Sequence, residues 1–452
     1  MIKQATLISF GLMAAMIQPL LFFLPAIFST LFLLNTLYLV PILVLIFILT
    51  DIFAVIALNI SINIHHVMPQ AILTVSAVIF FAVKSTFLRH SIYIILFIIF
   101  ALFLLLPLPS NEILYFRTLQ RSFLFPIVIL LLMNVVTNRN SFKLMKMFLL
   151  TVMFISIMLI MCQYAVGTNL YYEALGLHPF YQDRGIPIMS SGLPIGFETK
   201  AFFGGTIARP LGVFSSPDKF AYFLNIFLIP PSIYLLFRRK HSLFILFFVL
   251  ALFFHSLINV KAAALQFILF VTLFLSYLLF PRLSSIFRIA ITAFLITLGV
   301  KVVLFTVPES WLTGSGAIQH IWSLAYPFIY QPEFILNYFF GYGFGNAYED
   351  FKHAHGAESF VGSLMAGGGL FAVAGFFLIY AGVEKTLRKR LFTSTAQDFT
   401  RYMVLSSALW TGFFSSFFSI SVLSFFQTIS LSMCVLLSFG RLDDRGPLKQ
   451  HP

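Results

Sequence analysis

Charged residues are scarce in this chain of 452 residues. They make up 10% of it, whereas hydrophobic residues make up 60% and phenylalanine alone contributes 59 positions. A soluble domain carries about 25% charged residues. No polar stretch is long enough to form a separate soluble domain, so the composition excludes a water-soluble protein and predicts one membrane domain over residues 1–452.

Cysteine is also rare, because Cys162 and Cys434 are the only two. Neither has the spacing of a disulfide framework or a metal site. Both lie in apolar runs, where we expect buried small hydrophobic side chains. The N-terminus lacks a clear small-residue cleavage site and continues directly into apolar sequence, so we interpret it as a first membrane segment.

Long apolar runs recur along the chain at the length of a membrane-spanning helix, about 20 residues. Only helices satisfy lipid-exposed backbone within a single segment, and strand-like alternation is absent, so the fold expected is an all-α polytopic membrane protein. We expect one or two spans within 5–34. The other predicted spans are 37–60, 68–83, 90–108, 122–138, 144–165, 218–237, 242–258, 262–280, 287–306, 361–383, 402–418 and 420–440. The total is therefore thirteen or fourteen.

Basic loops predict the orientation of these spans, because lysine and arginine concentrate on the cytoplasmic side. The net charge of +13 is therefore assigned to membrane orientation, and no nucleic acid is expected as a partner. The cytoplasmic loops are those carrying Lys84 and Arg89, Arg139 to Lys146, Arg238 to Lys240, Arg282 and Arg288, and Lys385 to Arg390. A cytoplasmic N-terminus then requires fourteen spans.

Two long polar segments fall on the opposite face, which makes them external loops. Long loops in a compact protein are usually functional. No internal repeat is visible, which argues against a transporter built from symmetric repeats. The expected parts are N-terminal helices 1–165, a first loop 166–217, central helices 218–306, a second loop 307–360, C-terminal helices 361–440 and a cytoplasmic tail 441–452.

The first candidate site is the stretch RPLGVFSSPDK that ends the first loop. Pro217 and Asp218 predict a helix start, and Gly212 permits a tight turn. Arg209 is then held on a short rigid segment at the outer membrane surface, where a guanidinium can bind a phosphate with two parallel hydrogen bonds. The alternative is an interfacial arginine that extends toward water or pairs with Glu198 or Asp218.

The second candidate is Lys261, at the external turn between two predicted spans. A cation so close to apolar helices is costly without a partner, and an anionic headgroup would be one. A water-exposed turn lysine is the alternative.

The third candidate is a glycine-rich stretch, Gly341 to Gly345, followed by His353, His355 and Glu358. The glycines allow close backbone approach to a ligand, and the later side chains supply a possible base. They also resemble metal ligands, although no HExxH or paired-cysteine pattern accompanies them. A solvated polar loop is the alternative.

Aromatic residues are interspersed in both loops. Tyrosine and tryptophan belong at membrane interfaces, and they also stack on sugar rings. The stretch 317–331 has helical apolar spacing typical of an interfacial helix. The loop aromatics are Tyr171, Tyr172, Tyr181, Trp311, Trp322, Tyr326, Tyr330, Tyr342 and Tyr348.

In this order the three candidate sites resemble the O-antigen polymerase and O-antigen ligase superfamily over residues 160–440. That family has an R-x-x-G-x-F-x-x-P stretch before a span, and Arg209, Gly212, Phe214 and Pro217 match it. Its second arginine corresponds to Lys261, which keeps the charge but not the two-pronged geometry. Its histidine corresponds to His355 by residue type or to Glu358 by spacing.

The resemblance implies a membrane glycosyltransferase of the GT-C-like class that inverts the anomeric centre and needs no metal or other cofactor. Its substrates would be undecaprenyl-diphosphate-linked oligosaccharides in the membrane lipid, with a chain-length regulator as a possible protein partner. The expected catalytic residues are Arg209, Lys261, His353, His355 and Glu358, and the expected substrate-binding residues are Gly212, Lys219, Tyr342, Gly343 and Gly345.

The polymerase role is favoured, in O-antigen, capsule or exopolysaccharide synthesis. The first alternative is a ligase that transfers the glycan to lipid A core. Others are a transporter or flippase for lipid-linked sugars, and a membrane subunit without activity.

Overall fold

The computed structural model describes the central and C-terminal parts of the chain, and they are mostly helical. The described residues are 139–183, 186–200, 206–214, 216–227, 232–233, 235–236, 241–258, 260–281, 283, 287–294, 298, 335–341, 360–391 and 396–415. They belong to two compact units, the first ending at Val260 and the second beginning at Lys261. Each unit is treated by itself below.

Two long helices dominate the first unit, α8 (Arg139–Val166) and α13 (His241–Ile258). They coincide with the spans predicted near 144–165 and 242–258. Among the described residues, α13 is the single straight helix long and apolar enough to cross a membrane. Only 17% of its residues are buried, which separates it from the enclosed core helix of a soluble protein.

Helix α8 ends at a sharp bend. Gly167 has φ +95°, a conformation that glycine adopts without steric cost, and the chain turns there by 117° into α9 (Thr168–Ala174). Together, residues Thr151–Val166 of α8 and the whole of α9 have the length and apolar composition of a membrane span that is broken by this bend. The bend matches the predicted end of this span at residue 165.

The first long loop is a folded structure with its own core. It contains α9, α10 (Leu177–Asp183) and an antiparallel hairpin of β1 (Glu198–Lys200) and β2 (Thr206–Ala208), with Glu198 opposite Ala208. The all-α expectation is therefore wrong for this segment. Strands of three residues are too short to show a recognisable alternation of apolar and polar positions.

Aromatic residues fill the core of this loop. Tyr171, Tyr172 and Tyr181 are 7%, 0% and 1% exposed, and Phe197 packs edge-on against both Tyr172 and Tyr181. A tyrosine ring enclosed in this way cannot stack on a sugar. The sugar-stacking and membrane-interface interpretations are therefore both wrong for these three tyrosines, which stabilise the loop instead.

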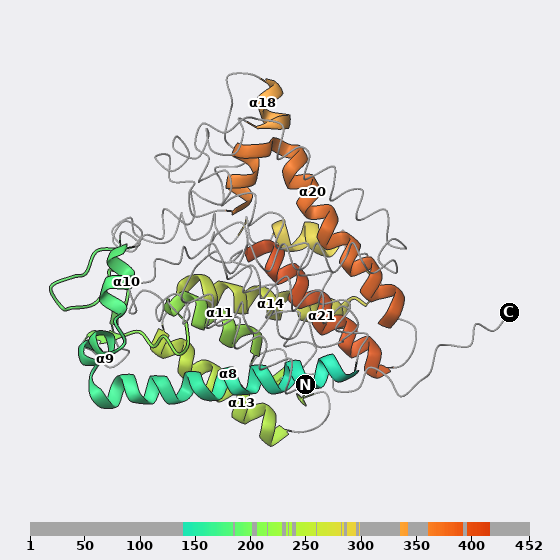
Figure 1. Cartoon of the computed structure of the whole chain (residues 1–452). Coiled ribbons are helices and arrows are strands. Elements are labelled where there is room, and N and C mark those ends of the chain that lie inside the picture. The colour runs from blue at the N-terminus through green and yellow to red at the C-terminus, as the bar shows by residue number, and fades with distance from the viewer. Residues whose placement is uncertain are drawn as a thin grey trace, which may run out of the picture. The chain divides into compact units, whose positions relative to one another are not determined.

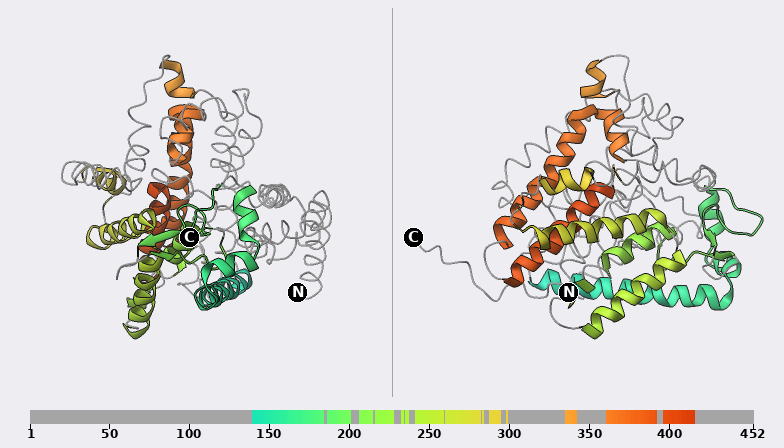
Figure 2. Two further views of the ribbon diagram at one scale, coloured as in Figure 1. Left: turned by 90° about the vertical axis from the view of Figure 1, so that its left-hand side faces the viewer. Right: turned by 180° about the vertical axis from the view of Figure 1, so that it is seen from behind.

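The second unit contains α14 (Lys261–Leu279), α18 (Ile335–Phe340), α20 (Phe360–Leu391) and α21 (Ala396–Ser415). Helix α20 is broken at Gly369, whose φ of +63° and ψ of −162° are not helical. Figures 1 and 2 show α18 at this bend, and a side chain at Gly369 would collide with the Phe339 backbone. The span expected over 361–383 is thus two helical pieces.

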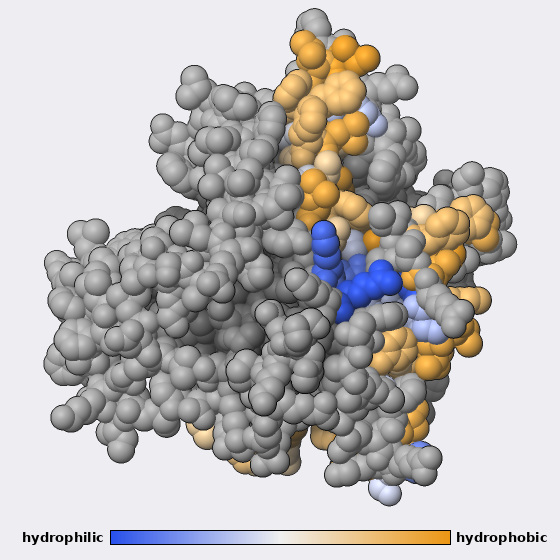
Figure 3. Space-filling view, turned by 90° about the vertical axis from the view of Figure 1, so that its right-hand side faces the viewer, coloured by the Kyte–Doolittle hydropathy of each residue, from blue (hydrophilic) through white to orange (hydrophobic). Residues whose placement is uncertain are grey.

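Apolar side chains are exposed on several helices. Phe154 and Met161 of α8 are 60% and 62% exposed, and Phe253 of α13 is 54% exposed. On the face drawn in Figure 3, most of the described surface is hydrophobic, with one hydrophilic patch. Such surfaces are typical of contact with lipid or with another apolar partner.

Cys162 is exposed on α8, so its interpretation as a buried residue is wrong. An apolar run indicates an apolar environment but does not distinguish protein interior from lipid. Cys434 lies outside the described residues.

Candidate functional site

The segment that carries Arg209 follows the last turns of α8 in the opposite direction. Tyr164 donates a hydrogen bond from its hydroxyl to the carbonyl oxygen of Ala208 at 2.8 Å. The Gln163 amide donates to the carbonyl of Arg209 at 3.3 Å and accepts from the Leu211 N–H at 3.4 Å. These contacts fix the position of the Arg209 backbone along α8.

Ser156, two turns before Gln163 on α8, also contacts the Arg209 segment. Its hydroxyl accepts a hydrogen bond from the Val213 N–H at 3.4 Å. The seven residues from Ser156 to Gln163 span roughly 10 Å along a helix axis. Buried non-helical backbone needs hydrogen-bond partners, and the buried side chains of Ser156 and Gln163 supply them here.

Gly212 makes the close approach to α8 possible. Its φ is +59°, and an added Cβ would lie 2.8 Å from Cβ of Ser156. Both observations confirm the turn predicted at this position. Because Gly212 is buried, its contact with α8 assigns it a packing role.

Helix α11 (Pro217–Phe227) begins where the sequence predicts a helix start. Ser216 is the cap, because its hydroxyl accepts a hydrogen bond from the Lys219 N–H at 3.4 Å. Pro217 occupies the first helical position and Asp218 the first turn, where a negative charge favours the helix dipole. The expected substrate-binding residue Lys219 thus lies in the first turn of α11, half-buried.

Arg209 is half-buried, and its buried Nε has no hydrogen-bond partner in the part of the chain that the structure describes. Burial lowers the pKa of the guanidinium, whereas the negative charge of Asp218 raises it. An arginine remains protonated under such opposing shifts. The site therefore contains a cation on a fixed backbone, with one donor that no described residue uses. The charge of Asp218 acts on this cation, and Asp218 is one of the two partners that the sequence suggested.

Glu198, the other anticipated partner, lies on the hairpin opposite Ala208. The Arg209 N–H donates to the Phe197 carbonyl at 2.7 Å, which extends the ladder by one position. Successive side chains of a strand point to opposite faces, so the register directs Arg209 and Glu198 to different sides of the hairpin.

His255, in the last turn of α13, is a residue that the sequence analysis did not single out. Phe214 stacks against Phe220 with ring centroids 6.0 Å apart, and Phe220 packs edge-on against Phe254 at 5.8 Å. The next residue, His255, bonds through Nε2 to Oδ1 of Asn225 at 2.6 Å. Its Nδ1 is buried and without a partner among the described residues. A lone histidine in an apolar run gives no sequence signal for this pairing.

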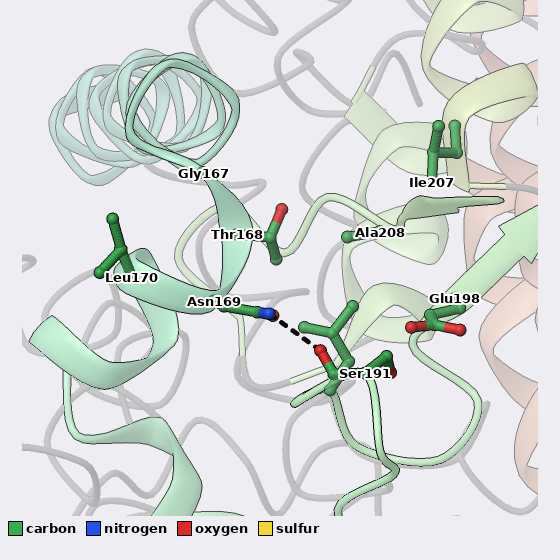
Figure 4. A pocket seen from close by; sticks show the side chains of 9 residues that line it. Gly167, Thr168, Asn169, Leu170, Ser191, Glu198, Ile207 and Ala208 are labelled. Atoms are coloured by element: carbon green, nitrogen blue, oxygen red, sulfur yellow. Dashed lines mark hydrogen bonds between the residues drawn. The ribbon is translucent and has the colours of Figure 1, made fainter. Parts of the chain in front are cut away.

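A cavity of about 590 Å³ opens on the first loop. One of its lining residues, Ala208, directly precedes Arg209 in the sequence. Figure 4 shows Thr168 and Asn169 of α9 on one side and Glu198 and Ile207 of the hairpin on the other. Asn169 donates from Nδ2 to the Ser191 carbonyl at 2.9 Å, which ties two walls of the cavity together. Spacing along the sequence gave no indication of this cavity, because its walls come from three separate segments.

The second and third candidate sites begin in the second unit, whereas Arg209 lies in the first. Lys261 is the first residue of α14 in the second unit, and its side chain is not described. Gly341 ends α18 with φ +73°, a glycine helix end, and is the last described residue of the glycine-rich stretch. The expected site residues outside the described part are Tyr342, Gly343, Gly345, His353, His355 and Glu358.

The second unit contains a buried acidic residue, Glu384, directly before the basic run 385–390. The sequence analysis did not identify it. Glu384 is 3% exposed and accepts hydrogen bonds from the Tyr277 hydroxyl at 2.6 Å and the Tyr402 hydroxyl at 3.1 Å. Its other oxygen accepts from Nε1 of Trp410 at 2.8 Å. A carboxylate with three donors is fully satisfied, which is typical of a structural group.

Arg288 adds a cation to this cluster. Its guanidinium lies 4.1 Å from the ring centroid of Tyr277 and donates to the carbonyls of Ser276, Phe280 and Leu283 at the end of α14. Arg288 therefore caps α14 and is 2% exposed, although its sequence position indicated an ordinary basic loop.

Comparisons with protein-family models, curated proteins and solved structures find no match to this chain.

Proposed function

We propose that this chain is a polytopic membrane glycosyltransferase that joins lipid-diphosphate-linked oligosaccharides at the periplasmic face of the bacterial inner membrane. The observation that carries the proposal is Arg209, a half-buried cation whose Nε lacks a partner among the described residues. Its segment is bonded to α8 by Gln163 and Tyr164. A guanidinium on a backbone that is fixed before the ligand arrives suits a diphosphate, because less of the chain has to be ordered on binding.

The contacts of Glu384 support the predicted alternation of the spans, in which three helix ends lie on one side. They join Tyr277 near the end of α14, Glu384 in the last third of α20 and Tyr402 near the start of α21. In the predicted topology these three positions all lie toward the cytoplasmic side. The exposed apolar faces of α8 and α13 are further support for a membrane location.

In the proposed reaction, a hydroxyl of the acceptor sugar attacks the anomeric carbon of the donor. The new carbon–oxygen bond forms as the bond to the diphosphate breaks, and the electron pair leaves with the diphosphate. Arg209 stabilises this negative charge, and Lys261 is the proposed second cation. His355 or Glu358 is the proposed acceptor of the hydroxyl proton. Direct attack inverts the anomeric centre.

The test uses purified full-length protein in lipid nanodiscs with lipid-linked repeat units. Arg209→Ala should lower the rate of chain extension by about 100- to 1,000-fold, the effect of removing one charge-stabilising donor. Arg209→Lys should retain part of the rate because it keeps the positive charge. A normal rate for Arg209→Ala would remove Arg209 from the mechanism.

The products distinguish polymerase from ligase. A polymerase converts the lipid-linked units alone into a ladder of chain lengths, whereas a ligase requires added lipid A core. Transport of intact lipid-linked units without any new glycosidic bond would instead support the flippase alternative.

The orientation has its own test. Glu173 is exposed on α9, and Glu173→Cys in a Cys162→Ala, Cys434→Ala background should react with a membrane-impermeant maleimide added to spheroplasts. Labelling that occurs only after the cells are broken open would place α9 in the cytoplasm and overturn the proposal.

A further inference from the structure

The cavity on the first loop is distinct from the Arg209 guanidinium, and its chemistry differs. Thr168 and Ser191 supply hydroxyls, Asn169 an amide and Glu198 a carboxylate, whereas Ile207 and Ala208 supply apolar surface. Its volume of about 590 Å³ lies within the range of small-molecule sites, about 300–1,000 Å³.

The walls of this cavity are held in place without a ligand. His178 bonds through Nε2 to the Gly192 carbonyl at 2.8 Å, and Asn169 bonds to the Ser191 carbonyl. The Met189 N–H donates to the Leu193 carbonyl at 2.8 Å, which closes the turn between them. Below lies the aromatic core of the loop. An open cavity whose walls are already hydrogen-bonded to one another keeps the ordering cost of binding low.

The charge of the cavity lining restricts the class of ligand that the cavity can bind. Among the described residues that line the cavity, Glu198 is the only one with an ionisable side chain. A carboxylate accepts hydrogen bonds from hydroxyls and repels an acidic group. The lining therefore suits an uncharged molecule with many hydroxyls and apolar C–H faces.

We infer that this cavity binds an uncharged oligosaccharide, with the Glu198 carboxylate accepting hydrogen bonds from sugar hydroxyls and excluding acidic sugars. Ala208 lines the cavity, and Arg209 follows it directly, with consecutive Cα atoms about 3.8 Å apart. The inference goes beyond the proposed function, because the hairpin register directs the Arg209 side chain to the face opposite Glu198 and the cavity is therefore a separate sugar-binding site.

The experiment measures binding alone, with labelled full-length protein in nanodiscs on an array of uncharged, amino and uronic-acid oligosaccharides. The wild type should retain uncharged oligosaccharides and reject uronic acids. Glu198→Gln and Thr168→Val should each weaken retention about tenfold, the effect of a lost hydrogen bond to a charged or polar group. Glu198→Lys should reverse the preference toward uronic acids, which loss of folding cannot produce.

Two matched variants separate this inference from the proposed function. Glu173→Gln changes an exposed glutamate of α9 that does not line the cavity, and it should bind as the wild type does. Arg209→Ala should keep array binding while losing chain extension. Array binding by a protein that extends no chain would retain the cavity assignment and reject the transferase. No retained oligosaccharide, or equal retention by Glu198→Lys and wild type across the array, would overturn the cavity assignment.

Discussion

Arg209 in the first unit and Glu384 in the second are both ionisable groups removed from water, yet their surroundings differ. Glu384 accepts hydrogen bonds from three side chains, whereas the buried Nε of Arg209 has no partner among the described residues. A buried charge with all its hydrogen bonds made stabilises the fold around it. A charge with an unused donor, on a segment that the rest of the unit holds rigid, is suited to a ligand. Burial alone therefore does not describe these two groups, because their hydrogen-bond partners differ.

The largest effect on stability is expected at Glu384. Glu384→Ala leaves three buried donors without an acceptor, which should lower the free energy of unfolding by about 3 kcal/mol or more. Glu384→Gln retains an acceptor oxygen and should cost less. Thermal unfolding in nanodiscs measures both, with exposed Glu173→Ala as the control. An unchanged midpoint for Glu384→Ala would remove the contrast between the two charges.

At Arg209 we expect a large loss of activity with little loss of stability. Arg209→Met keeps a long side chain but removes the charge, so chain extension should fall about 100-fold or more while the unfolding midpoint stays within the equivalent of about 1 kcal/mol. Rate and midpoint are measured on the same preparation. A large fall in the midpoint would make Arg209 a structural residue like Glu384.

A smaller loss of stability is expected where the Arg209 segment meets α8. Gly212→Ala forces a left-handed residue, at about 1–2 kcal/mol, and also places a Cβ against Ser156. Gly196 is the matched control, since it has φ +81° but open space around an added Cβ. Gly212→Ala should therefore lower the midpoint more than Gly196→Ala. Equal losses would show that the α8 contact is unimportant.

The smallest effect is expected at the cap of α11. Ser216→Ala removes the oxygen that accepts from the Lys219 N–H and should cost about 1 kcal/mol. Ser216→Asp supplies another capping oxygen and should restore the midpoint. Failure of Ser216→Asp to do better than Ser216→Ala would argue against a capping role.

Local features were predictable from the sequence. The start of α11 depends on Pro217 and Asp218, and the turn at Gly212 depends on one residue, so neighbouring letters were sufficient. The bounds of α13 and the end of α8 also follow from the length of their apolar runs, whereas α8 begins at Arg139, ahead of the span predicted from residue 144. Each of these features is determined within a few turns of chain.

Features that join distant segments were not predictable. The partners of Glu384 lie 18 to 107 residues away, and the hydrogen bonds of Gln163 reach 46 and 48 residues ahead. The hairpin of β1 and β2 is too short to give a pattern. Composition likewise cannot say whether Tyr172 faces a sugar, lipid or its own loop, because an aromatic ring suits all three.

Helix α8 has 28 residues, roughly 42 Å at the helical rise, which is more than the thickness of a bilayer's hydrocarbon layer. Through Gln163, Tyr164 and Ser156 it holds the backbone on both sides of Arg209. The position of α8 therefore sets the position of the Arg209 backbone. Tilting or sliding α8 would raise or lower the cation together with it.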